Sequence, residues 1–407
     1  MARPKWQRRV VFLVVVLVAA QAATTAPVAA QAAPQSIDSC TTIDAPGTYV
    51  LSGNLSASGD CLAVEADGVT LDGAGYTLAG DGNGTGLLTS GDDLAVSNLT
   101  VDGFDVGVDL SGRNGSVDAS TFSDNRVGVA TTDARNATLS NATVTNNTGD
   151  GVGVTLGSVA VVDSRLADNG GYGLSTAPGE ATTVVRTAID GNGDGGALFT
   201  SGTATLRDSA VRDNAGDGVF LDGVNTATLV NDTVSGNNGT GLAVAESTDV
   251  SLSAATVANN TGDGILVAGT LTVSNAVVTD NGGDGIRALP ATLVDATDVT
   301  VRDSVLSGNA GMPVGGEAAD AVTVTGNADG EAGSNVPADF GDGDSDDGDS
   351  DDGDSDDGAG TTDGSDDADP DATTDDTEEN APASLSGVLD GLASLVGSLA
   401  GALADLF

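Results

Sequence analysis

The chain contains no histidine, and only two of its 407 residues are cysteine. Zinc and copper sites draw mainly on imidazole and thiolate ligands, so this composition disfavours a site for either metal. Aromatic residues make up 3% of the chain, which leaves few side chains able to stack on flat ligands. These shortages argue against the commonest catalytic and metal centres.

Basic side chains are also scarce after residue 33, where nine arginines and no lysine stand against all 60 acidic residues. The formal charge of that part is 9 − 60 = −51. Nucleic acid and anionic membranes are therefore excluded as charge-driven partners. An acidic, lysine-free composition is typical of extreme halophiles, in which molar salt screens the repulsion, and it indicates a salt-loving archaeal source.

The first 33 residues have the pattern of a secretory signal peptide. A basic start precedes the apolar run Val10–Ala20, and Ala30-Gln31-Ala32 forms a cleavage site. The apolar run is short for a membrane-spanning helix, which disfavours a retained anchor. Arg8-Arg9 leaves open whether export uses the general or the twin-arginine pathway. We expect a secreted or cell-surface protein.

Both cysteines, Cys40 and Cys61, follow this signal closely. An even pair in an exported protein predicts a disulfide. Two thiolate ligands of a metal are the competing interpretation, which the absence of histidine disfavours.

A repeat dominates the middle of the chain. In nine consecutive units an apolar residue X is followed by another at X+5 and by asparagine at X+8. The units recur every 21 to 23 residues, except for a last spacing of 28 that holds an insertion around Leu289–Thr297. The asparagines are Asn125, Asn147, Asn169, Asn192, Asn214, Asn237, Asn260, Asn281 and Asn309.

Each unit holds two or three short β-segments separated by Gly, Asn and Asp, with no helical period between them. A single unit cannot bury its own apolar face, so the units must stack. We predict an all-β fold over residues 34–338: a right-handed single-stranded parallel β-helix of roughly ten coils of 21–23 residues, with X and X+5 as interior ladders.

The repeated asparagines and aspartates have separate expected roles. Stacked asparagines can hydrogen-bond one another and the turn backbone, so we predict a structural turn column. Asp150, Asp217, Asp263 and Asp284 share one repeat position. Calcium could bridge carboxylates there, especially in the consecutive coils of Asp263 and Asp284. We favour plain exposed turn residues, and we expect no other cofactor.

Residues 339–382 are rich in Asp and Gly and predict a disordered acidic linker. Residues 383–407 predict an apolar amphipathic helix with a heptad seam. Three roles stay open for this helix: self-association, docking to a surface partner, and membrane association. Asp390, Asp405 and the lack of flanking basic residues argue against a standard anchor.

The stretch Cys40–Gly80, which includes "VTLDGAGYTLAG", resembles the opening of right-handed β-helix repeat proteins exported by haloarchaea. These are grouped with the NosD-like, copper-related accessory family and with carbohydrate-binding or sugar-hydrolysing β-helices. The resemblance covers about residues 40–330 and implies first coils pinned by the cysteine pair. A copper role is disfavoured, because Met312 is the only methionine after the start.

We therefore predict a non-catalytic structural or binding protein of the cell surface, with a glycan as its partner. The alternative is a polysaccharide lyase or glycoside hydrolase that uses Asp carboxylates or calcium. No catalytic residue is assigned, because the Gly-His-Gly and basic cluster of family hydrolases are missing. Tyr172, Phe199 and Phe220 lie in nearby units at different repeat positions, and we expect an accessory rim or filler.

Ten Asn-X-Ser/Thr sequons predict glycan acceptors in an exported protein. They are Asn54, Asn83, Asn98, Asn114, Asn136, Asn141, Asn146, Asn231, Asn238 and Asn259.

Overall fold

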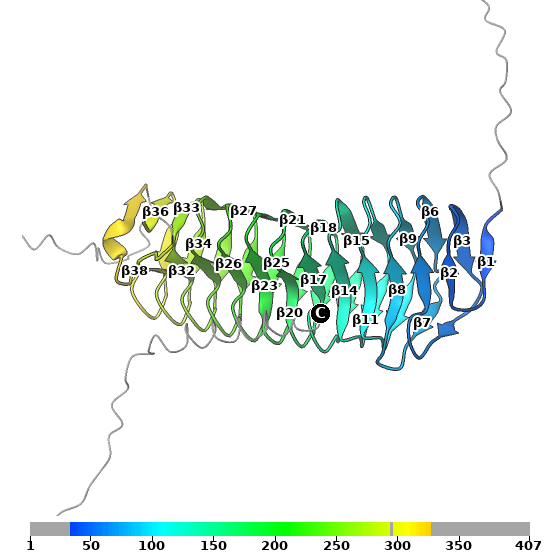
Figure 1. Cartoon of the computed structure of the whole chain (residues 1–407). Helices are drawn as coiled ribbons and strands as arrows, with labels where there is room; N and C mark the ends of the chain where they lie inside the picture. Colours follow the sequence, from blue (N-terminus) through cyan, green and yellow to red (C-terminus); the bar gives the residue numbers. More distant parts are fainter. Residues whose placement is uncertain (1–32, 294–295, 327–407) are drawn as a thin grey trace, which may run out of the picture. The chain divides into compact units, whose positions relative to one another are not determined.

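The computed structural model describes residues 33–293 and 296–326 (Figure 1). They belong to the first of two units of the chain, Met1–Phe340, and the second unit, Gly341–Phe407, lies outside the described residues. Residues 1–32 of the predicted signal, the acidic linker 339–382 and the helix 383–407 also lie outside them. Among the described residues, no helix is long and apolar enough to cross a membrane.

The chain visits three parallel sheets in turn, and each strand pairs with the equivalent strand one coil away. This confirms the predicted parallel β-helix. The first sheet contains β1 (Gln35–Ile37), β3 (Gly47–Leu51), β6 (Val69–Asp72), β9 (Ala95–Ser97), β12 (Ser116–Asp118), β15 (Ala137–Ser140), β18 (Ser158–Val162), β21 (Ala181–Val185), β24 (Thr203–Arg207), β27 (Thr226–Val230), β30 (Val250–Ser253), β33 (Thr270–Ser274), β36 (Asp298–Arg302) and β39 (Val322–Thr325).

The second sheet receives the chain after the first. It contains β4 (Leu55–Ser56), β7 (Thr77–Ala79), β10 (Thr100–Asp102), β13 (Thr121–Ser123), β16 (Thr143–Thr145), β19 (Arg165–Ala167), β22 (Ala188–Asp190), β25 (Ala210–Arg212), β28 (Thr233–Ser235), β31 (Thr256–Ala258), β34 (Val277–Thr279) and β37 (Val305–Ser307).

The third sheet completes each coil. It contains β2 (Thr41–Ile43), β5 (Leu62–Val64), β8 (Thr85–Thr89), β11 (Val106–Leu110), β14 (Val127–Thr132), β17 (Val152–Thr155), β20 (Tyr172–Thr176), β23 (Gly195–Thr200), β26 (Val219–Asp222), β29 (Leu242–Ala245), β32 (Ile265–Ala268), β35 (Ile286–Ala288) and β38 (Val314–Gly315). A short 3-10 helix, η1 (Ala319–Ala321), lies between β38 and β39.

The solenoid has more coils than the sequence predicted. Its sheets hold 14, 12 and 13 strands, which corresponds to about 12 coils instead of roughly ten. The sequence count was too low because the coils before Val117 lack the asparagine of the repeat. In the coil of Val101, Phe104 takes that position, and its backbone N–H donates to Asn125 Oδ1 at 2.9 Å.

The predicted interior ladders are confirmed. Val117, Leu139 and Val161 pair in register along the first sheet, and Phe122, Val144 and Leu166 pair along the second. Each of these side chains is at most 1% exposed. Full burial of one such side chain contributes roughly 1.5–3 kcal/mol, so the stacked ladders supply the main drive for folding.

A column of hydroxyl groups lies buried between the first and second sheets. Ser120, Ser164, Thr187 and Ser209 each accept a backbone N–H from the preceding coil. Each hydroxyl also donates to the carbonyl two residues earlier in its own coil. The sequence did not indicate this column, because serine and threonine are equally common in exposed turns.

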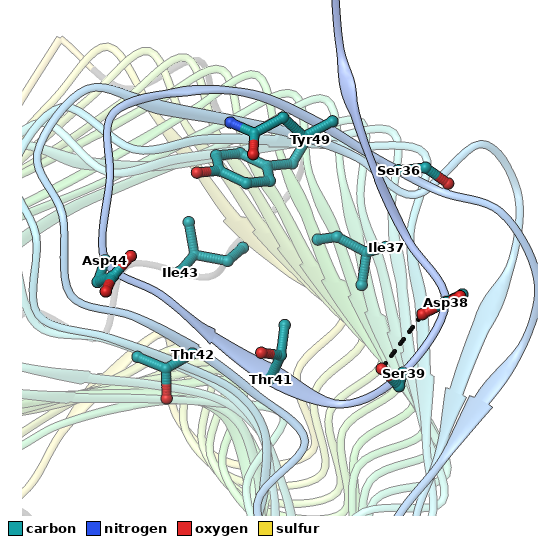
Figure 2. A pocket seen from close by; sticks show the side chains of 10 residues that line it. Ser36, Ile37, Asp38, Ser39, Thr41, Thr42, Ile43, Asp44 and Tyr49 are labelled. Carbon is teal, nitrogen blue, oxygen red and sulfur yellow. Dashed lines mark hydrogen bonds between the residues drawn. The ribbon is translucent and has the colours of Figure 1, made fainter.

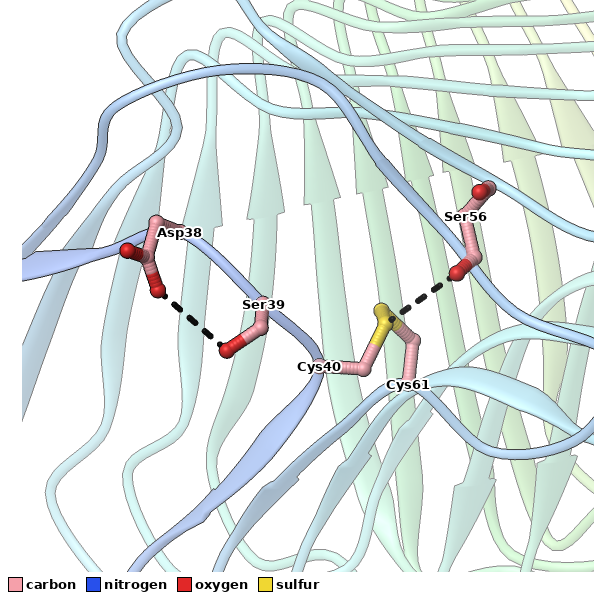
Figure 3. Close-up of a disulfide and its surroundings, with 5 residues drawn as sticks. All are labelled: Asp38, Ser39, Cys40, Ser56 and Cys61. Carbon is pink, nitrogen blue, oxygen red and sulfur yellow. Dashed lines mark hydrogen bonds between the residues drawn. A yellow bond between two sulfur atoms is a disulfide. The ribbon is translucent and has the colours of Figure 1, made fainter.

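The disulfide between Cys40 and Cys61 joins the first two coils (Figure 3). The two Cα atoms are 4.5 Å apart. Each cysteine directly precedes a strand of the third sheet, and those strands pair from Thr41–Leu62 onward. The bond therefore confirms the predicted pairing and extends the registered ladder by one position.

Replacing both Cys40 and Cys61 with serine is expected to lower the free energy of unfolding of the first coils by about 3 kcal/mol. This is the stabilisation expected from a bridge between two cysteines at this separation in the sequence, because the bridge restricts the unfolded chain. Hydrogen exchange of β1, β2 and β3 measures this loss. Unchanged protection of these strands would contradict the expectation, and exchange of β24–β27 provides the internal control.

A cavity of about 320 Å³ opens at the first coil (Figure 2). Ile37, Ile43 and Tyr49 line its inner part, and the surrounding side chains are polar. Tyr49 donates its hydroxyl to the carbonyl of Ala45 at 2.9 Å. This cavity is the end of the core ladder, and the rest of the core continues from it along the solenoid.

Candidate functional site

The asparagine column is built into the turn between the second and third sheets. The carboxamide of Asn214 illustrates it: Oδ1 accepts from the backbone N–H of Asn192 at 3.0 Å and from its Nδ2 at 2.9 Å. Nδ2 donates to Ile189 O at 3.2 Å and to Asn237 Oδ1 at 2.9 Å. Every donor and acceptor of this side chain is used by the fold, so none is left for a ligand.

The four aspartates proposed for calcium each cap the next coil. Asp150, Asp217, Asp263 and Asp284 accept the backbone N–H of the residue at the same position one coil later, at 2.7–2.8 Å. The next coil also carries a glycine close to each carboxylate: Gly171, Gly239, Gly283 and Gly311. A side chain at these glycines would collide with the carboxylate, so these aspartates have a structural role in the turn.

Asp263 and Asp284 lie in consecutive coils, as the calcium hypothesis requires. Burial raises the pKa of the Asp263 carboxyl. The hydrogen bond from the Asp284 N–H lowers this pKa, and the charge of Asp284 raises it to a smaller extent. Within the described residues, no group of three or more acidic or cysteine side chains is arranged to hold a metal ion. Calcium binding at this pair stays a prediction.

The three aromatic residues separate into two environments. Phe199 is 2% exposed and belongs to the core. Tyr172 and Phe220 are half-buried on the outer side of the third sheet, in β20 and β26. A Cβ atom at Gly195 would lie 2.8 Å from Tyr172 Cε1. The tyrosine ring therefore lies along the sheet, over the space that glycine leaves in the next coil.

Three carboxylates surround this ring. Burial raises the pKa of Tyr172 to about 12, and the charges of Asp217, Asp194 and Asp150 add to the shift. Burial also raises the pKa of both Asp217 and Asp194. The phenol is protonated at neutral pH, as an ordinary tyrosine also is, and it is a hydrogen-bond donor among acceptors. We call Tyr172, Asp150, Asp194 and Asp217 the Tyr172 cluster.

An apolar stripe runs beside the Tyr172 cluster. In successive strands of the third sheet, Leu198, Phe220, Ala243 and Leu266 stand in register on the outward side, and Arg287 follows Leu266. Ser175 precedes Leu198 and donates its hydroxyl to Asp150. Leu198 and Ala243 are buried, so the accessible apolar surface of this face comes from the half-buried Phe220 and Leu266. Together with the carboxylate acceptors, it suits ligands with apolar ring faces and hydroxyl edges.

The Tyr172 cluster could not be recognised by motif, since its members occupy two repeat positions in four coils. One signal was available. Tyr172, Gly195 and Asp217 occupy the same repeat position in three successive coils, so a large side chain beside a glycine could have indicated a ring lying across coils.

All ten sequon asparagines are exposed. Seven of them adopt a positive φ at the ends of strands: Asn98, Asn114, Asn136, Asn141, Asn146, Asn231 and Asn259. Several also donate to a carboxylate of the preceding coil, as Asn231 does to Asp208 Oδ1 at 2.7 Å. Their positions leave the carboxamides accessible, and glycosylation stays a prediction.

Solved structures similar to this chain include the following two. The A-module of the mannuronan C-5 epimerase AlgE4 from Azotobacter vinelandii is 18% identical, with a TM-score of 0.59, over 69% of this chain and 91% of that chain. The Dettilon tailspike protein gp208 is 11% identical, with a TM-score of 0.51, over 65% of this chain and 62% of that chain. At these identities the likeness shows a shared fold.

No curated protein matches the chain in sequence. The family model described as "Right handed beta helix region" matches residues 57–211 and 178–329, which together span most of the coils described above. The parallel coils and their repeated ladders agree with this match, and the chain belongs to the right-handed β-helix family.

Proposed function

We propose that this protein binds a neutral polysaccharide on the outer side of its third sheet. The observation that carries the proposal is the Tyr172 cluster, in which a protonated phenol lies among three carboxylates. Carboxylates accept hydrogen bonds from sugar hydroxyls, and an aromatic ring packs against the apolar face of a sugar. The mannuronan epimerase with the same fold supports the choice of a carbohydrate ligand.

The charge of the face decides between classes of polysaccharide. Asp150, Asp194 and Asp217 give the Tyr172 cluster a negative potential, and no arginine stands in the outward column between Ser175 and Leu266. A uronic acid polymer would be repelled there at low salt. Neutral glucans and mannans face no such penalty, and we propose these as ligands.

Replacing Tyr172 with alanine is expected to weaken retention on the bound polysaccharide at least tenfold, because it removes both the ring and the phenol donor. The measurement is affinity electrophoresis of residues 33–338, in high salt, through gels that contain neutral or acidic polysaccharides.

The matched control is Tyr76→Ala, which removes an exposed tyrosine beside the second sheet. Equal retention of wild type and Tyr172→Ala would remove the support for this face. Tight binding of an acidic polymer alone would overturn the choice of ligand.

One observation favours an enzyme as the second candidate. Glycoside cleavage requires a carboxylic acid that keeps its proton beside another that is ionised, and burial raises the pKa of Asp217 and Asp194 next to the tyrosine. Release of new sugar ends from a bound polymer tests this candidate. Ends that disappear in Asp217→Asn, with retention unchanged, would replace the binding proposal by a hydrolase or lyase.

We also propose where this binding protein acts. A predicted signal peptide and a formal charge of −51 after residue 33 support secretion to the surface of a halophilic archaeon. The coils would then hold the polysaccharide outside the cell in strong salt.

A further inference from the structure

We infer that the outer face of the first sheet, from β18 to β33, is a contact surface for a second copy of this chain, and that two copies pair through it in strong salt. The inference goes beyond the proposed function, because the polysaccharide is assigned to the third sheet, which this pairing does not use. It rests on the charge, the register and the area of one sheet face.

Six neighbouring strands form this first-sheet face: β18, β21, β24, β27, β30 and β33. Their inward side chains are buried, and their outward side chains are half-buried or exposed. The outward residues are short and uncharged apart from one arginine: Ser158, Ala160, Val162, Ala181, Thr183, Val185, Thr203, Thr205, Arg207, Thr226, Thr228, Val230, Ser251, Ser253, Thr270, Thr272 and Ser274. None of them is acidic, although 60 acidic residues follow residue 33.

The outward residues stand in straight rows along the solenoid. The central row pairs in register from coil to coil and consists of Ala160, Thr183, Thr205, Thr228, Ser251 and Thr272. Neighbouring members of a row are about 4.8 Å apart. Because side chains of similar, short length give an even surface, two such faces can pack against each other as stacked sheets do, about 10 Å apart.

The lack of carboxylates on the first-sheet face indicates the kind of partner. A neutral ligand gives no reason to exclude them, since carboxylates accept hydrogen bonds from hydroxyl groups. The other two sheets do carry outward acids, such as Asp190 in β22 and Asp222 in β26. A basic partner would bind the acidic faces instead.

An acidic partner, in contrast, is repelled wherever carboxylates stand. The first-sheet face offers it a surface without them, and Arg207, the one charged residue there, is positive. A second copy of this chain, with a formal charge of −51 after residue 33, is such a partner. An even face of one composition is also complementary to itself, which a twofold pair requires.

The area of the face fits a weak dimer. At about 4.8 Å per strand and about 3.3 Å per residue, six strands of about five residues cover roughly 29 Å by 16 Å. Two such faces bury about 1,000 Å² together, the size at which specific interfaces begin. Molar salt shortens the range of the repulsion between the remaining carboxylates to about 3 Å, so pairing should strengthen as salt is added.

Sedimentation equilibrium of the chain from residue 33 onward, in molar salt, tests this pairing. We expect the wild type to dimerise with a dissociation constant in the micromolar range. Combining Thr205→Glu with Thr228→Glu should raise this constant about tenfold or more, because four carboxylates then meet at the contact. The matched control combines Thr233→Glu with Thr256→Glu, at paired positions of β28 and β31 on the second sheet.

A second pair of variants changes exposed residues only, which keeps the test independent of folding. Arg207→Glu should weaken the dimer, whereas Arg212→Glu, in β25 of the second sheet, should not. Circular dichroism of every variant verifies that the coils are intact.

Three results would overturn the inference. The first is a wild type that stays monomeric in molar salt. The second is a dimer that persists unchanged when glutamates are placed on the first-sheet face, since the contact then lies elsewhere in the chain. The third is equal weakening by the variants of the first and second sheets, since net charge alone then decides. Retention on polysaccharide gels reports on the third sheet, so the proposed function and this inference fail separately.

Discussion

Asn214→Ala is expected to lower the free energy of unfolding by about 4 kcal/mol, because it removes four hydrogen bonds of a buried side chain. The backbone N–H of Asn192 and one N–H of its Nδ2 would remain buried without their partner. An unsatisfied buried polar group costs about 1–3 kcal/mol, so two such groups and a small cavity account for the loss.

Urea denaturation in high salt, followed by circular dichroism, measures this effect. The control is Asn225→Ala, since Asn225 is exposed and should change the midpoint little. A loss below about 1 kcal/mol for Asn214→Ala would mean that water replaces the carboxamide, and that the column is weaker than its geometry indicates.

The second large effect concerns a single acid in the hydroxyl column. Asp232 takes the place of serine there: its Oδ1 accepts the N–H of Ser209 at 2.8 Å, and its Oδ2 is buried without a hydrogen-bond partner. The residue is 1% exposed. Burial raises the pKa of this carboxyl to about 7.

The sign of the pH dependence follows from this shift. The folded protein holds the Asp232 proton up to about pH 7, whereas the unfolded chain releases it near its ordinary pKa. The unfolded state therefore binds fewer protons between about pH 4 and pH 7, and stability falls over that window. A shift of about three units corresponds to about 4 kcal/mol.

Asp232→Ser should accordingly stabilise the protein by up to about 4 kcal/mol at pH 8 and have little effect at pH 4. Denaturation midpoints at several pH values test this, with the exposed Asp249→Ser as control. Equal effects of Asp232→Ser at pH 4 and pH 8 would show that the carboxyl does not change its protonation on unfolding.

The sequence predicted the parts of the fold that repeat. The apolar residues at X and X+5 and the asparagine at X+8 must each contact a residue of the same type in the next coil. A repeat in the sequence therefore becomes a ladder of stacked side chains in the structure. The first coils were undercounted because the chain from Cys40 to Val96 forms the same strands without the asparagine. The hydroxyl column was missed because its positions vary among Ser, Thr, Asp and Ala.

The candidate site was harder to foresee. The sequence placed Tyr172, Phe199 and Phe220 at different repeat positions but did not show which of them is buried: Phe199 lies in the core, and the other two are half-buried. For the four aspartates the sequence favoured turn residues and left calcium as the alternative, and each of them caps a neighbouring coil. Such roles depend on the residue at the same position one coil away, which a local sequence pattern does not show.

The carboxylate of Glu246 accepts the backbone N–H groups of Thr292 and Leu293, and these contacts change how the chain could gain or lose length. Almost all other contacts join a coil to its immediate neighbour, so the energy is close to a sum of nearest-neighbour terms. Whole coils could then be added or deleted in evolution at little cost, with every ladder closing again. The contacts of Glu246 with Thr292 and Leu293 skip the neighbouring coil and join the coil after it. Between β29 and β35, therefore, the reach of the Glu246 carboxylate to Thr292 and Leu293 fixes the number of coils.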